Sequence, residues 1–178
     1  MATTIEAVTD ILQRADIKFD LDGDTGLVRT VWQRNDTQVT LLVFLLESGD
    51  LVQLRAPALL RATDDATKPL LFRAMLQMAY EMRLVQFEYD PADGEVSTCI
   101  DVALEDARLT DEQLLRCCSV LLDVSFMARD RLVTILETGR DPALTSDEVD
   151  PEEAEQRQSQ LDAMYELARM MRNGGGDA

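Results

Sequence analysis

Residues 27–56 read LVRTVWQRNDTQVTLLVFLLESGDLVQLRA, and this stretch decides the fold. Apolar and β-branched residues dominate it, and two groups of turn-forming residues interrupt it, at 35–36 and at 48–50. Links this short favour antiparallel pairing of neighbouring strands. The stretch therefore predicts three strands, which are Leu27 to Gln33, Val39 to Glu47 and Leu51 to Ala56.

The middle strand is apolar on both of its faces. Because side chains alternate along a strand, its residues divide into two sets. One set is Val39, Leu41, Val43 and Leu45, and the other is Leu42, Phe44 and Leu46. A layer of helices covers only one side of a sheet, so we expect one of the two sets to lie on an open face.

Helix signals surround these strands. Thr3 and Glu6 have capping-box spacing before a first helix of about three turns. Pro69 suits the first turn of a second helix, because the N–H that proline lacks has no helical partner there. Thr110 and Gln113 form another capping box, which opens a long helix.

Alternating apolar residues predict two further strands between the second helix and the long helix. They flank the turn at 90–94, which reads DPADG, and form a hairpin over residues 85–102. The predicted order is therefore α-β-β-β-α-β-β-α, followed by a C-terminal helix. This is an α+β fold in which an antiparallel sheet carries its helices mainly on one face.

The core pattern closes near Gly139. We therefore divide the chain into an α+β domain, residues 1–139, and a C-terminal part, residues 140–178. The second part is predicted to be an acidic linker, an amphipathic helix and a Gly-rich tail without fixed structure. The apolar face of that helix has a suitable length to dock on the open sheet face; it comprises Leu161, Met164, Ala168 and Met171.

Composition excludes several kinds of function. The 178 residues carry a net charge of −17, which opposes binding to nucleic acid and anionic membranes. The first interpretation of this charge is solubility, and the alternative is attraction to a basic partner segment. No histidine is present, so His-based catalysis and His metal sites are excluded. No apolar run approaches the roughly 20 residues that span a bilayer. The N-terminal residues lack the features of a signal peptide, so we expect a cytoplasmic protein.

Residues that often carry chemistry have structural explanations here. Cys99, Cys117 and Cys118 lack metal-ligand spacing and are expected to be free, reduced and mostly buried. Ser125 has no G-x-S-x-G motif around it. Arg129 falls within the apolar stripe of the long helix, where its head either reaches water or pairs with a buried carboxylate. We therefore predict no catalytic residue, no metal ligand and no cofactor.

Two surfaces are candidates for contacts with other proteins. The first is an apolar strip on the sheet, which we expect to bind a partner; it comprises Trp32, Leu42, Phe44 and Leu46. In this strip, Trp32 extends the apolar set of the middle strand onto the preceding strand. The second surface, on the second helix and the long helix, is the expected homodimer contact; it comprises Leu71, Met75, Met78, Met82, Val120 and Val124.

Three parts of the chain resemble a known family. They are the run LLFRAMLQMAY at 70–80, the hairpin through Gly94 and the run LTDEQL at 109–114. Over roughly residues 5–137 the sequence resembles the YbjN-type family, described as bacterial sensory transduction regulators. Its element order resembles the type III secretion chaperone-like fold. The resemblance implies a compact, often dimeric domain without enzymatic activity, and secretion chaperones of this fold hold an extended client segment on hydrophobic patches.

The function expected from the sequence is therefore non-enzymatic. It is that of a chaperone-like or adaptor protein that binds a polypeptide through an apolar sheet or helix surface. The alternative is a regulator that senses a small molecule in a pocket between the sheet and the helices. An enzyme using carboxylates ranks last, because no carboxylate pair is singled out by its spacing.

Overall fold

The computed structural model of the chain describes residues 2–105 and 107–144. In chain order the elements are α1 (Ile5–Arg14), β1 (Asp20–Asp22), β2 (Leu27–Arg34), β3 (Thr37–Leu46), the 3₁₀ turn η1 (Glu47–Gly49), β4 (Leu51–Arg61), α2 (Lys68–Glu81), β5 (Gln86–Tyr89), β6 (Glu95–Ala103) and α3 (Asp111–Thr138). The predicted C-terminal helix and tail, with the apolar face that begins at Leu161, lie outside the described residues.

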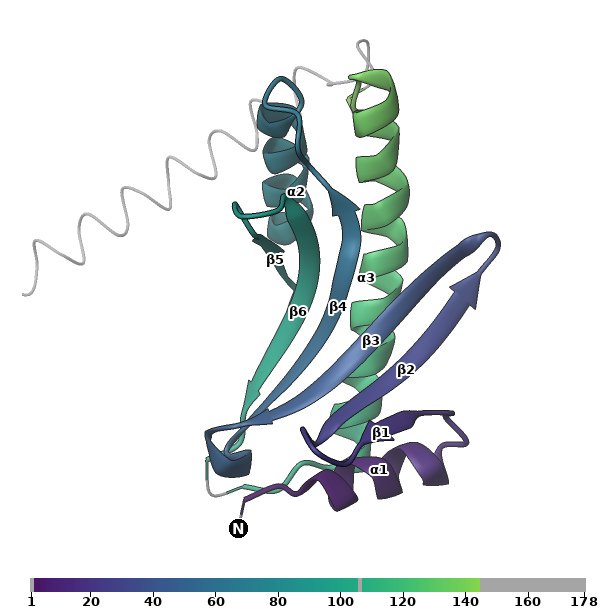
Figure 1. The fold of residues 1–178 in the computed structure, drawn as a ribbon, viewed down its shortest axis with the longest axis vertical. Helices are drawn as coiled ribbons and strands as arrows, with labels where there is room; N and C mark the ends of the chain where they lie inside the picture. Colours follow the sequence, from purple (N-terminus) through teal and green to yellow (C-terminus); the bar gives the residue numbers. More distant parts are fainter. Residues whose placement is uncertain (1, 106, 145–178) are drawn as a thin grey trace, which may run out of the picture. The chain divides into compact units, whose positions relative to one another are not determined.

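The expected fold class is confirmed. The strands form one antiparallel sheet in the order β1-β2-β3-β4-β6-β5. Helix α3 runs along one face of this sheet, with α2 beside its C-terminal half and α1 near its N-terminal end (Figure 1). The three described helices therefore leave the other face of the sheet uncovered.

Two clusters of buried side chains join the sheet to the helices. The larger lies between α1, α3 and the central strands and includes Leu12, Leu41 and Leu121. The smaller lies between α2, the C-terminal half of α3 and the ends of β4 and β6, and it includes Leu71 and Leu132. Each side chain of this size contributes roughly 1.5–3 kcal/mol when it is fully buried, so the domain has a core that needs no disulfide.

The ends of α3 follow the sequence prediction. The hydroxyl of Thr110 accepts from the Gln113 N–H, and the Gln113 side chain accepts from the Thr110 N–H, which completes the capping box. At the other end Gly139 has a φ of 66°, the left-handed conformation in which glycine commonly terminates a helix. Both ends could be predicted because capping depends on residues close in sequence.

The capping prediction for α1 was wrong by one residue. Thr4, not Thr3, is the cap, and its hydroxyl accepts from the N–H of Ala7. Thr3 is buried and makes long-range bonds instead: its N–H donates to the carbonyl of Gly49, and its hydroxyl accepts from the N–H of Leu109. These contacts tie the start of the chain to the turn after β3.

The strands depart from the prediction at two places. A short additional strand, β1, pairs with the beginning of β2, so the sheet has one strand more than expected. Strand β4 continues to Arg61, beyond the predicted end at Ala56, because a bulge carries it past Pro57. Proline cannot donate to the ladder and is tolerated at such a bulge.

Arg129 stabilises this bulge. Its guanidinium donates to the carbonyl of Leu59, whose neighbour Ala58 has a φ of 52°. The head of Arg129 is therefore neither free in water nor paired with a buried carboxylate, the two alternatives that the sequence left open. A carbonyl group freed from the strand ladder is the acceptor.

A buried polar pair links α3 to β6. The hydroxyls of Ser125 and Thr98 lie 2.7 Å apart, and the Ser125 hydroxyl also donates to the Leu121 carbonyl at 2.6 Å. Since the single hydrogen of Ser125 is used in that second bond, Thr98 must be the donor to Ser125. Ser125 is thus a structural residue of the core.

Contacts within the chain divide it after Ala143, and the first compact unit spans Met1–Ala143. Asp141, beyond the predicted boundary at 139, pairs with Arg131 of α3. The separate folding of residues 1–139 stays a prediction. None of the helices in the described part of the chain has the length and apolar character needed to cross a membrane.

Candidate functional site: an open sheet face and a cavity beside α3

The strip predicted on β3 lies on the face of the sheet that the described helices leave open. Leu42 and Phe44 are half-buried there, and Leu46 is 39% exposed. The alternate residues Val39, Leu41 and Val43 are buried under α3. The structure thus decides which of the two apolar sets of β3 faces outward.

Charged side chains border this strip. Leu42 lies opposite Arg29 of β2 and opposite Arg55 of β4. Arg29 pairs with Asp20 at 2.7 Å, and Arg55 pairs with Glu88 at 2.9 Å. An apolar centre with a polar, solvated rim is the usual composition of a protein-binding surface.

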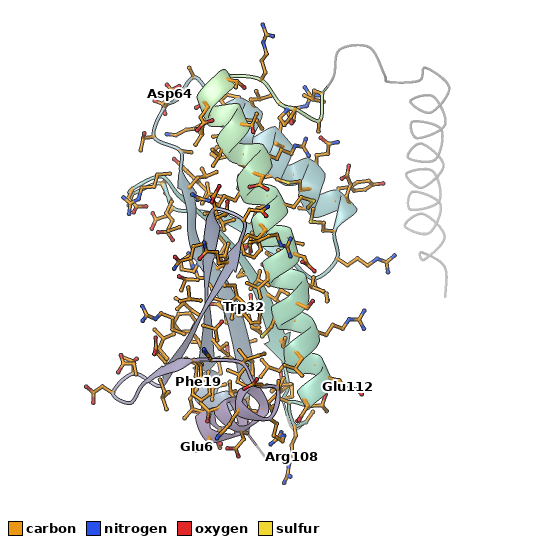
Figure 2. All side chains as sticks on the ribbon, turned by 90° about the vertical axis from the view of Figure 1, so that its right-hand side faces the viewer. Glu6, Phe19, Trp32, Asp64, Arg108 and Glu112 are labelled. Atoms are coloured by element: carbon orange, nitrogen blue, oxygen red, sulfur yellow. The ribbon has the colours of Figure 1, made fainter. Side chains whose placement is uncertain are left out.

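Trp32 does not belong to the strip, contrary to the prediction. It pairs with Val39, and directly opposite residues of an antiparallel pair point to the same face. Trp32 therefore points toward α3, between the strands and the helix (Figure 2). An exposed apolar residue of β2 on the open face is Val31, which is 48% exposed and was not part of the predicted strip.

The sequence contained the signal that places Trp32. A two-residue turn, Asn35-Asp36, sets Arg34 opposite Thr37. Counting back along the strands from this pair brings residue 32 opposite residue 39. Applied to the sequence, this register would have put Trp32 with the buried set of β3.

Trp32 instead forms one wall of a cavity of about 340 Å³ between the end of β2 and α3. Its indole N–H donates to the Thr30 hydroxyl at 2.7 Å. The opposite wall belongs to α3 and includes Leu122 and Phe126, which are nearly fully buried. At the mouth, the Arg34 guanidinium contacts Asp123 at 2.5 Å and lies 4.6 Å from the Phe126 ring centre.

The residues predicted for a homodimer contact are largely in the core. Leu71, Met75, Met78 and Val124 are buried, and Met82 and Val120 are half-buried against core side chains. The prediction was wrong for the buried ones because their side of α2 and α3 packs inside the monomer. The exposed apolar residues of α2 lie on its other side, and they are Leu76, at 72% exposure, and Tyr80, at 85%.

The three cysteines are free and buried, as expected. Burial raises the pKa of Cys118 to about 12, and the neighbouring Cys117 adds to the shift. Burial, together with the nearby Glu88 carboxylate, also raises the pKa of Cys99 to about 12. These two groups are therefore thiols at neutral pH, and a thiol is a poor nucleophile and metal ligand.

Residues 4–133 match the family profile of YbjN, described as "Putative bacterial sensory transduction regulator". The chain belongs to the YbjN family. The match covers the whole described domain except its ends. Comparison with curated protein sequences finds no significant match.

Solved structures resemble the domain in fold. The crystal structure of YbjN from E. coli has a TM-score of 0.56 at 12% identity, over 75% of this chain and 92% of that chain. The ExsC-ExsE complex gives 0.52 at 20% identity, over 72% and 92%. The HopA1-SchA chaperone-effector complex gives 0.49 at 17% identity, over 68% and 88%. The expected YbjN membership and secretion chaperone-like fold are thus confirmed.

Proposed function

We propose that this member of the YbjN family is a non-enzymatic, chaperone-like protein that holds an apolar segment of another polypeptide on the open face of its sheet. The observation that carries the proposal is the strip defined by Val31, Leu42, Phe44 and Leu46, which is apolar and has no cover among the described residues. A solvent-exposed apolar surface of this kind usually marks a contact. The ExsC-ExsE structure, which has the same fold, is itself a complex of proteins.

The charge of the protein favours a basic client. The net charge of −17 attracts positive segments over several ångströms and increases the rate of encounter. The apolar strip then provides the short-range contact. We place this activity in the cytoplasm, where three unpaired thiols remain reduced.

We further propose that the protein is a homodimer, with the exposed side of α2 as the contact. Leu76 and Tyr80 are one helical turn apart, and Leu84 follows the end of the helix and is also exposed. This apolar surface is separate from the open sheet face. A dimer formed through α2 would therefore leave the strip free for a client.

Binding to an unfolded basic polypeptide tests the main proposal. Reduced, alkylated and fluorescently labelled lysozyme is the probe, and anisotropy reports its binding. Phe44→Asp should weaken binding at least about tenfold, because the new carboxylate would have to be desolvated in the contact. Leu46→Asp, at a more exposed position, should act in the same direction.

Leu21→Asp is the matched control. Leu21 is an exposed apolar residue of β1 outside the strip, so its substitution should leave the affinity for lysozyme unchanged. Circular dichroism would show that all three variants remain folded. Folded Phe44→Asp and Leu46→Asp proteins that bind lysozyme as tightly as the unsubstituted protein would refute the proposal.

A further inference from the structure

The cavity beside α3 is distinct from the open sheet face. It lies on the helix side of the sheet, where residues distant in sequence meet: Ile17 before β1, Trp32 at the end of β2, and Leu115, Leu122 and Phe126 of α3. Its volume of about 340 Å³ is within the range of small-molecule sites, roughly 300–1,000 Å³.

We propose that this cavity binds a small amphiphilic carboxylate, with its apolar body against Trp32 and Phe126 and its carboxylate on Arg34. The walls of the cavity explain why the body of the proposed ligand is apolar. Two aromatic rings and aliphatic side chains offer dispersion contacts. The polar side chains of the lining are Gln33, Arg34, Ser119 and Asp123. The one polar group of Trp32, the indole N–H, already donates to Thr30, so the ligand body needs no acceptor at that wall.

Arg34 explains why the proposed ligand carries a carboxylate. One guanidinium nitrogen donates to Asp123, and the Phe126 ring lies against the guanidinium plane, so the group is held at the mouth of the cavity. In the described part of the chain, no acceptor other than Asp123 contacts the Arg34 guanidinium. Its remaining donors can bind a carboxylate in the forked geometry that arginine favours.

One electrostatic effect opposes the binding of such a ligand, and another supports it. The net charge of −17 repels an anion at a distance. That repulsion is screened beyond about 8 Å at physiological ionic strength, whereas the bond to Arg34 acts at direct contact. The pair with Asp123 is exposed and therefore weak, but Asp123 also lines the cavity and repels a second carboxylate, so the ligand must displace Asp123 or bind the other nitrogens of Arg34.

Binding at this site is non-covalent. Cys118 lines the cavity, but its thiol is protonated at neutral pH because burial raises its pKa. It contributes an apolar contact to the wall. The ligand can therefore bind and leave according to its concentration, as a regulatory molecule must.

The intrinsic fluorescence of Trp32 reports on this cavity directly, since Trp32 is the single tryptophan of the chain. Octanoate is the probe, because it does not absorb where tryptophan emits, and octanamide is its uncharged match. Titration of the full chain with octanoate should give a saturable fluorescence change at or below about 1 mM. Octanamide should bind about tenfold more weakly, since it lacks the charge-assisted bonds to Arg34.

Three variants test the assignment. Arg34→Gln should weaken octanoate about tenfold and leave octanamide unchanged. Leu115→Phe should weaken both ligands by filling the cavity, and Phe44→Asp on the open sheet face should weaken neither. Thermal unfolding monitors the fold of each variant, and octanoate should raise the melting temperature of the unsubstituted protein by mass action.

Several results would overturn the proposal. One is a fluorescence change that does not saturate. Another is an affinity of the Arg34→Gln protein for octanoate equal to that of the unsubstituted protein. A third is loss of octanoate binding in a folded Phe44→Asp protein. Quenching of Trp32 by a labelled basic peptide without tryptophan, but not by octanoate, would assign the cavity to a polypeptide client instead. None of these results depends on whether the open sheet face binds a client.

Discussion

The hydroxyl pair of Thr98 and Ser125 shows how a single polar residue can determine part of a core. Both side chains are fully buried, so every hydrogen must find an acceptor inside the protein. The chain of bonds runs from Thr98 to Ser125 and on to the Leu121 carbonyl. Removing Ser125 breaks this chain and leaves a donor without an acceptor.

Ser125→Ala should therefore destabilise the protein by about 1–3 kcal/mol, because the buried Thr98 hydroxyl loses its acceptor. Adding Thr98→Val removes that unsatisfied group with little change of shape. The double variant should recover most of the lost stability. Urea unfolding of the two single variants and the double variant measures the coupling, and purely additive effects would contradict the assigned direction of the bonds.

At the scale of elements, a polar junction connects α2, α3 and the residues that follow α3. The guanidinium of Arg131 makes two bonds to the Asp141 carboxylate, at 2.8 and 2.7 Å, and one to the side-chain oxygen of Gln77 on α2. Asp141 also accepts from the Ala143 N–H. The side chain of Asp141 is fully buried and that of Arg131 is 12% exposed, so water competes little for these bonds.

This junction makes stability depend on pH. Hydrogen bonding from Arg131 holds the pKa of Asp141 below its usual value, despite a smaller opposing effect of burial. A carboxyl whose pKa is lowered by folding stabilises the protein above its unfolded-state pKa of about 3.9. That contribution is lost as the pH falls through the folded-state pKa.

Asp141→Asn should lower the free energy of unfolding by about 1–3 kcal/mol at pH 7. The difference from the unsubstituted protein should begin to shrink near about pH 4, where the carboxyl becomes protonated in the unfolded state, and should disappear as the pH falls through the lower folded-state pKa. Urea unfolding from pH 7 to pH 3 measures this. Asp130→Asn, an exposed position on α3, is the control, and a pH-independent effect of Asp141→Asn would show that the bond, rather than the charge, dominates.

At the scale of the molecule, three surfaces have separate proposed tasks. The open sheet face is proposed for a polypeptide, the cavity beside α3 for a small carboxylate, and the outer side of α2 for a second copy. The sheet separates the first two surfaces, because the cavity lies on its helix side. Variants of one surface should therefore leave the others unaffected, which makes the three proposals separately testable.

Light scattering tests the dimer. At tens of micromolar, a range in which interfaces of standard size usually hold (roughly micromolar dissociation constants or tighter), the protein should have the mass of two chains. Tyr80→Lys should shift it to one chain, since the new charge would lie within the contact. Leu21→Lys, on β1, should have no such effect, and a monomer before substitution would refute the dimer.

Local patterns predicted much of this fold because they depend on residues close in sequence. The alternation in β3, the turn after Tyr89, the capping box of Thr110 and the left-handed Gly139 each appear in the structure where expected. Backbone geometry alone imposes these features. The family resemblance, which rested on residues 70–80, the hairpin through Gly94 and residues 109–114, is confirmed.

The tertiary structure decided which of several equivalent local choices was used. Thr3 and Thr4 are both competent caps, but the Thr3 hydroxyl accepts from the distant Leu109 N–H, and Thr4 is the cap. Helix α2 is apolar on two sides, and packing against α3 buries the side of Leu71 rather than that of Tyr80. The cavity at Trp32 exists only because β2 and α3, far apart in the sequence, meet there. Contacts between distant residues select among these choices, and no local pattern contains that information.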